Sequence, residues 1–66
     1  MRHFYTIKEY RAFGDYYVCE DEKGLSYNIT FNVLYQNDPY ELINKQISCS
    51  YTIPYISIAV DVKLEN

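Results

Sequence analysis

The 66 residues are enough for one domain, residues 1–66, which would bury only about 60% of the surface of its unfolded form. A hydrophobic content of 48%, with nine tyrosines, excludes a disordered chain. The net charge of −3 and the scattered lysines and arginines exclude the basic patch of a free-standing nucleic-acid binder, so we expect no direct nucleic-acid binding. Because a single copy is expected to be only marginally stable, the sequence favours a homo-oligomer.

The N-terminal third predicts a pair of hairpins. Residues 2–10 alternate loosely and contain aromatic and β-branched side chains, which favours a strand. Residues 12–15 are typical of a turn, since Gly14 accepts a positive φ, and residues 16–20 form the next predicted strand. Residues 21–24 connect it to the third strand, with Gly24 in the left-handed position of a short loop.

The clearest strand signal is residues 25–35, in which apolar side chains occupy the odd positions. Up to residue 32 the even positions carry only uncharged polar groups: Ser26, Asn28, Thr30 and Asn32. After this strand, Asp38 is a good helix N-cap and Pro39 suits the first helical position. The sequence therefore predicts one or two turns of helix between the third and fourth strands.

The run from residue 47 to 65 is too long for one straight strand in so small a domain. About 18 residues would span ~60 Å, whereas a compact domain of this length has a diameter of about 28 Å. Near Pro54 the apolar side chains change from odd-numbered to even-numbered positions. We therefore expect a bulge or a break at this point. The alternative is a strand that projects into another subunit. The predicted fold is mainly β, bordering on α+β. It is a small, strongly curved antiparallel sheet or half-barrel of about five strands, with a closed barrel as the variant.

Ser48, Ser50 and Thr52 repeat the uncharged polar pattern of the third strand. The simplest interpretation is an ordinary solvated sheet face. The functional interpretation is an interface, because charged groups are depleted at interface cores. The acidic run Glu20, Asp21 and Glu22 is either a solvated turn or a charge that attracts a basic partner. The predicted interface residues are Glu20, Asp21, Glu22, Asn28, Thr30, Asn32, Ser50, Thr52 and Tyr55.

The tyrosines mostly share the apolar phase of their strands and so build core. Tyr10, Tyr16, Tyr40 and Tyr55 are the ones that we expect to reach a partner surface, because tyrosine combines a large apolar body with a hydroxyl.

Catalytic patterns are weak. His3 has no nucleophile at a suggestive spacing, and Cys19 and Cys49 lack the close pairing of zinc ligands. We expect no enzyme activity, no catalytic or metal-binding residue and no cofactor. The cysteines are expected to be reduced and buried, because no signal peptide or membrane span is present and the chain is expected to be cytoplasmic.

No family motif is recognisable. In composition (short, acidic, tyrosine-rich and β) the chain is similar to small phage- or virus-encoded inhibitors of host proteins, some of which mimic the charge of DNA, although the likeness covers no motif. It implies a protein that acts by occupancy on a basic or nucleic-acid-binding host protein, in the host cytoplasm if viral. The alternatives are an oligomeric protein that sequesters a small ligand such as a nucleotide, and a small structural or assembly subunit.

Overall fold

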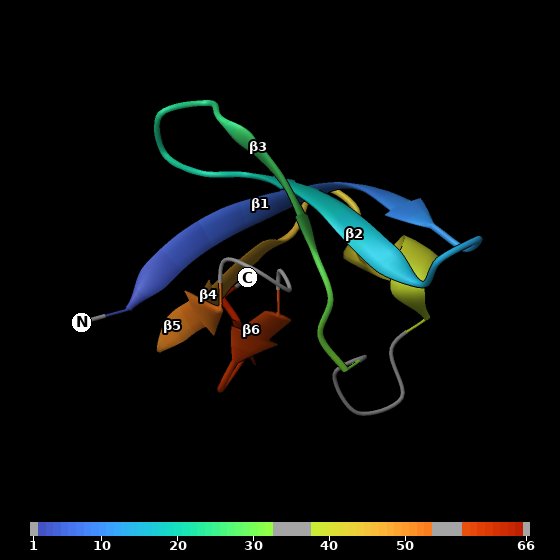
Figure 1. Ribbon diagram of the computed structural model, residues 1–66. Helices are drawn as coiled ribbons and strands as arrows, with labels where there is room; N and C mark the ends of the chain where they lie inside the picture. Colours follow the sequence, from blue (N-terminus) through green and yellow to red (C-terminus); the bar gives the residue numbers. More distant parts are fainter. Residues whose placement is uncertain (1, 33–37, 54–57, 66) are drawn as a thin grey trace.

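The computed structural model describes residues 2–32, 38–53 and 58–65, with only the backbone of residues 51–53. The main sheet has five antiparallel strands in the order β3-β2-β1-β4-β7, and β5 and β6 form a separate antiparallel pair (Figure 1). The elements are β1 (His3–Arg11), β2 (Tyr16–Glu20), β3 (Ser26–Ile29), η1 (Pro39–Leu42), β4 (Gln46–Cys49), β5 (Tyr51–Ile53), β6 (Ile58–Val60) and β7 (Lys63–Leu64).

The sheet curves like a half-barrel and is not closed. The β5–β6 pair lies between the end of β4 and the end of β3. On one side Ser50 N–H donates to Val60 O (3.0 Å). On the other, Thr30 and Ile58 form a single parallel bridge, in which Ala59 N–H donates to Thr30 O (3.1 Å). The predicted mainly β fold, with its curved antiparallel sheet of five strands, is therefore confirmed.

A bulge in β1 decides which side chains enter the core. Ile7 pairs with Cys19, but the register then shifts, so that Tyr10 pairs with Tyr17. The extra residue moves the even position Tyr10 onto the face that Ile7 occupies. There its ring packs against Tyr17, with the ring centroids 5.0 Å apart.

Both predicted turns are present. In the β1–β2 turn Gly14 has φ +110° and the next residue, Asp15, has φ 54°. A side chain at Gly14 would also meet the ring of Tyr16, because an added Cβ would lie 3.0 Å from it. This turn therefore needs glycine for both backbone and space.

The predicted helix is a single 3-10 turn. Asp38 caps it by accepting from the backbone N–H of Tyr40 (2.9 Å), and Pro39 begins it. The turn stops after Leu42 because the chain bonds at once to β1: Asn44 N–H donates to Ile7 O (2.7 Å) and Ile7 N–H donates to Lys45 O (2.9 Å). Asn44 takes φ 71°, in a turn that Lys45 N–H closes by donating to Leu42 O (3.0 Å), and the buried Leu42 side chain closes this end of the core.

The long C-terminal run breaks into several short strands. β5 and β6 pair as antiparallel strands across residues 54–57, so the expected break near Pro54 is confirmed, while a bulge at Pro54 itself lies outside the described residues. A further bend follows at Asp61, which has φ 59°. The chain thereby fits within 27 × 24 × 21 Å, with a radius of gyration of 10.6 Å. Within the described residues no helix combines the length and apolar character needed to cross a membrane.

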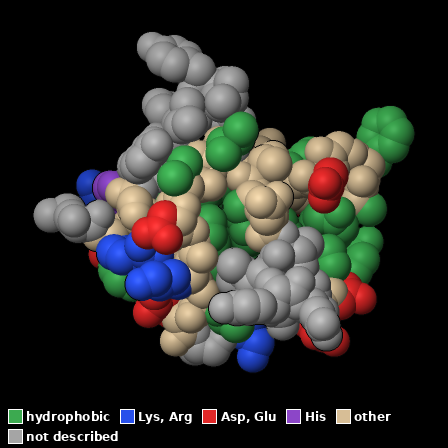
Figure 2. Space-filling view, turned by 90° about the horizontal axis from the view of Figure 1, so that it is seen from below, with side chains coloured by type: hydrophobic (Ala, Val, Ile, Leu, Met, Phe, Trp, Pro, Cys, Tyr) green, Lys and Arg blue, Asp and Glu red, His purple; other side chains and the backbone are tan. Residues whose placement is uncertain are grey.

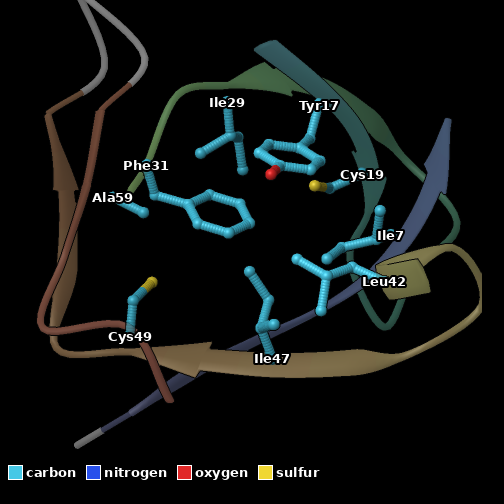
Figure 3. Packing of buried hydrophobic residues seen from close by; sticks show 9 residues of the cluster. All are labelled: Ile7, Tyr17, Cys19, Ile29, Phe31, Leu42, Ile47, Cys49 and Ala59. Carbon is cyan, nitrogen blue, oxygen red and sulfur yellow. The ribbon is translucent and has the colours of Figure 1, made fainter. Parts of the chain in front are cut away.

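One cluster of buried side chains fills the concave side of the sheet. The ring of Tyr17 stacks on that of Phe31, with centroids 4.3 Å apart, and the Tyr17 hydroxyl points into the cluster (Figure 3). Among the described residues that hydroxyl has no hydrogen-bond partner. Cys19 and Cys49 are buried free thiols. The members are Ile7, Tyr17, Cys19, Ile29, Phe31, Leu42, Ile47, Cys49 and Ala59.

Candidate functional site

The two uncharged polar rows do not form one surface. In the main sheet, Ser26 and Asn28 lie in β3 and Ser48 lies in β4, and the strands β2 and β1 separate these two. Ser26 is opposite Glu20 and Asn28 is opposite Val18. The exposed polar groups of β3 therefore border a strand that carries a charge, rather than a second uncharged row.

Four further predicted interface residues are Thr30, Asn32, Thr52 and Tyr55. Thr30 and Asn32 are exposed beyond the end of β3. Thr52 pairs through its backbone with Ala59, which also bonds to Thr30, so β6 lies between Thr30 and Thr52. Tyr55 lies outside the described residues.

Ser50 belongs to a polar network that fixes both ends of the chain to β4. The guanidinium of Arg2 donates to the Ser48 hydroxyl and carbonyl (both 2.9 Å), to the Ser50 hydroxyl (3.4 Å) and to the Asp61 carboxylate (2.8 Å). Ser50 also donates to Asp61 (2.7 Å), and the hydrogen bonds from Ser50 and Arg2 lower the pKa of that carboxyl. The buried Ser48 hydroxyl donates to Glu65 (2.5 Å). Because every partner of Arg2 is more than 40 residues away, no sequence pattern predicts the network.

The acidic turn is held by its central residue. One carboxylate oxygen of Asp21 accepts from the backbone N–H groups of Lys23 and Leu25 (both 2.9 Å), and the other accepts from the Tyr27 hydroxyl (3.0 Å). Partial burial raises the pKa of Asp21, but these hydrogen bonds together outweigh it and leave the pKa below its ordinary value. Asp21 therefore shapes the turn, and only Glu20 and Glu22 remain as acids without that role.

A cavity of about 440 Å³ opens between this turn and the start of β1. The rings of Tyr5 and Tyr27 meet edge to face in it, with centroids 5.8 Å apart. Charges of both signs surround the rings. We call this region the charged end; its lining residues are Arg2, His3, Phe4, Tyr5, Asp21, Glu22, Lys23, Leu25 and Tyr27.

The opposite end of β2 carries exposed aromatic side chains. Phe13, at the tip of the β1–β2 turn, is 99% exposed, and Tyr40 is 57% exposed. Tyr10 connects Tyr40 to the core, because its ring meets Tyr40 edge to face at 5.2 Å and also packs on Tyr17. We call Tyr10, Phe13 and Tyr40 the aromatic end. Figure 2 shows hydrophobic side chains gathered toward this side, beside acidic ones, whereas charges of both signs gather near the histidine on the other.

A hydrogen bond between Tyr10 and Asp15 fixes the β1–β2 turn that carries Phe13. The Tyr10 hydroxyl donates to the Asp15 carboxylate (2.7 Å), and this hydrogen bond, aided by burial, raises the pKa of Tyr10 to about 12. Tyr10 and Tyr40 were among the tyrosines expected at a partner surface, but Phe13 was missed. The available signal was an aromatic residue within a turn, where side chains normally point into water.

The groups with chemical reactivity do not converge. His3 is opposite Cys49 in the β1–β4 register, yet the histidine is exposed and the thiol is fully buried. Burial raises the pKa of Cys49, and it raises the pKa of Cys19 to about 12, which opposes formation of a thiolate. Within the described segments, no three His, Cys, Asp or Glu side chains are placed to hold a metal ion. Comparison with protein-family models, with curated proteins and with solved structures found no match.

Proposed function

We propose that the chain is a small non-catalytic binding protein that acts by occupancy, and that its aromatic end inserts into an apolar pocket on a protein partner. The 99% exposure of Phe13 carries this proposal. A phenylalanine at a turn tip contributes nothing to the core, whereas buried aromatic anchors dominate the energy of many interfaces. The rigid turn below it limits the entropy lost on binding.

The charges near the aromatic end favour a partner with a basic rim. Asp15 lies two residues after Phe13 in the β1–β2 turn. Asp38 caps the 3-10 turn, and Glu41 is exposed within that 3-10 turn. Together with the net charge of −3, they would attract a positively charged surface and speed encounter. A basic or nucleic-acid-binding host protein, met in the cytoplasm and inhibited by occupancy as phage- or virus-encoded inhibitors do, fits this chemistry.

A second candidate function uses the charged end. Its cavity combines the Tyr5 and Tyr27 rings with the side chains of His3 and Lys23. An aromatic ligand with an anionic group, such as a nucleotide, would stack on the rings and pair with the Lys23 ammonium group. Asp21 and Glu22 line the same cavity and would repel that anion, so we place this function second.

Photo-crosslinking from the two ends separates these functions. A benzophenone amino acid replaces Phe13 in one variant and Leu25 in a matched variant; both positions are exposed, at 99% and 57%. In lysate of the producing cells, position 13 should yield a defined adduct with a different protein, and position 25 should yield far less of that adduct. Equal labelling from both positions, or none from position 13, would contradict the proposal. A nucleotide that co-purifies and is lost in Tyr27→Ala would support the second candidate instead.

A further inference from the structure

The outer edge of β3 presents main-chain groups that have no partner among the described residues. Asp21 N–H donates to Leu25 O (3.0 Å), so the odd-numbered residues of this strand turn their main-chain groups toward β2. The even-numbered residues turn away, as Thr30 shows by accepting from Ala59. Ser26 and Asn28 therefore direct both N–H and C=O outward, and no described residue pairs with them.

In the part of the chain that the structure describes, this edge lacks the features that usually block an edge strand, which are lysines, prolines, bulges and covering segments. Residues 25–32 contain no charged residue and no proline. The four residue pairs between β2 and β3 run without a register shift, so the strand has no bulge. Figure 1 shows no described strand beside the outer side of β3 next to the β2–β3 turn.

We propose that β3 pairs with β3 of a second copy of this chain. A two-fold axis at Tyr27 places Ser26 opposite Asn28 of the partner subunit, and Asn28 opposite Ser26 of the partner subunit. Residues of each such pair exchange two hydrogen bonds, so every outward main-chain group of Ser26 and Asn28 is satisfied. The two five-stranded sheets then form one continuous antiparallel sheet.

A second copy fits this edge better than an unrelated peptide for two reasons. The outward positions are self-complementary about Tyr27, which is what a two-fold interface requires. Each copy carries a net charge of −3, so two copies repel unless they meet on an uncharged surface such as Leu25–Ile29. Pairing also covers part of Leu25 and Tyr27, which are 57% and 41% exposed.

The proposal is independent of partner binding at the aromatic end, which is reached from the other end of β2. The contact is small, so we expect a weak dimer that forms in the high micromolar range, well below the affinity of interfaces of standard size. Failure of the crosslinking experiment from position 13 would leave this dimer unaffected, and the reverse also holds.

Two substitutions at one position test the pairing. Asn28→Pro removes an outward N–H and no bond to β2, and proline is tolerated at strand edges. Asn28→Ala removes the side chain and keeps the main-chain groups. In sedimentation velocity up to about 1 mM, wild type and Asn28→Ala should rise toward twice the 7.9 kDa of the monomer, while Asn28→Pro stays monomeric.

Amide exchange of the wild-type chain provides a test that does not depend on the folding of a variant. Exchange at Ser26 and Asn28 should slow as the concentration rises, and exchange at the exposed Glu22 should not change. A wild-type chain that stays monomeric throughout would overturn the proposal. So would a dimer in which Ser26 and Asn28 exchange as fast as in the monomer, or an Asn28→Pro variant that dimerises like wild type.

Discussion

The two ends of β2 use the same kind of residues in different ways. At each end a tyrosine hydroxyl donates to an aspartate: Tyr10 to Asp15, and Tyr27 to Asp21. At the charged end the aspartate also accepts two backbone N–H groups, so its charge is used within the turn. At the aromatic end the bond supports a turn whose tip, Phe13, contacts nothing below it and is 99% exposed.

In the function that we propose, the acidic run and the binding surface do not coincide. The residues that stand out in the sequence at positions 20–22 include one that shapes its own loop. The residue with the largest unexplained apolar exposure lies at the other end of the same strand. We therefore propose that Asp21 stabilises its turn and that Phe13 binds the partner, and the following substitutions test that division.

The largest expected effect is the loss of partner binding in Phe13→Ala. Truncating an aromatic anchor at the centre of an interface commonly costs 2 kcal/mol or more, so affinity should fall roughly 30-fold or further. The free energy of unfolding should change by less than about 0.5 kcal/mol, because the side chain is outside the core. Calorimetric titration with the partner protein that the crosslinking experiment identifies measures the affinity. Leu25→Ala is the control, and an equal loss of affinity in both variants would remove the distinction between the ends.

Asp21→Ala should show the opposite result. It removes an acceptor of three hydrogen bonds, so the thermal midpoint should fall by several degrees while partner affinity stays close to wild type. Glu22→Ala removes the same charge from an exposed neighbour and should leave the midpoint nearly unchanged. Equal midpoints for the two variants, measured by circular dichroism, would show that Asp21 does not hold the turn. A test of charge steering must therefore substitute Glu20 and Glu22 and keep Asp21.

Acid should affect the charged end first. The folded-state pKa values of Asp21 and Asp61 are lowered, so their contribution to stability is fully present above the ordinary carboxyl pKa near 3.8. It is lost as the pH falls through the lower folded values. Amide exchange followed downward from pH 5 should show opening at residues 21–25 and at the Arg2 network before the aromatic end. Simultaneous opening at both ends would contradict this order.

Tyr17→Phe should stabilise the protein by about 1 kcal/mol, because it removes a buried hydroxyl that has no partner among the described residues. The phenylalanine ring would keep the stacking on Phe31 and the ring contact with Tyr10. Urea denaturation measures the change, and Tyr5→Phe provides a comparison at a partly buried tyrosine. A loss of stability in Tyr17→Phe would indicate that the hydroxyl is satisfied in solution.

The smallest expected effect is in alkali at the aromatic end. The Tyr10 pKa is raised to about 12, so the folded state holds this proton more tightly than the unfolded state. The corresponding stability is complete below pH 10 and is lost as the pH rises toward 12. Absorbance titration of Tyr10→Phe should lack this late-titrating group. An ordinary value near 10 for Tyr10 in the folded chain would show that the bond to Asp15 does not persist.

Local patterns explain the parts of the fold that the sequence predicts well. Alternation defines the strands, Asp38 and Pro39 define the helical turn, and Gly14 and Gly24 define the two hairpin turns. The bulge after Ile7 was not predicted, because it depends on the register of β1 with β2. Whether the two polar rows share a surface depends on strand order, which alternation does not encode and which separates β3 from β4. Of the candidate site, Tyr10 and Tyr40 could be predicted, whereas the exposure of Phe13 depends on how the turn projects.

The central claim is that a protein partner binds at the aromatic end. Chemical-shift mapping with the partner that the crosslinking experiment identifies tests this claim most directly. The isotope-labelled chain is titrated with that protein, and the changes in amide chemical shift are measured in two sets of residues. The first set is residues 10–16 and 38–42, and the second set is residues 21–28. We predict that the large shifts fall on the first set, around Phe13 and Tyr40, with small shifts in the second set. Large shifts confined to residues 21–28 would contradict the account, because the partner would then be bound at the charged end and the edge of β3.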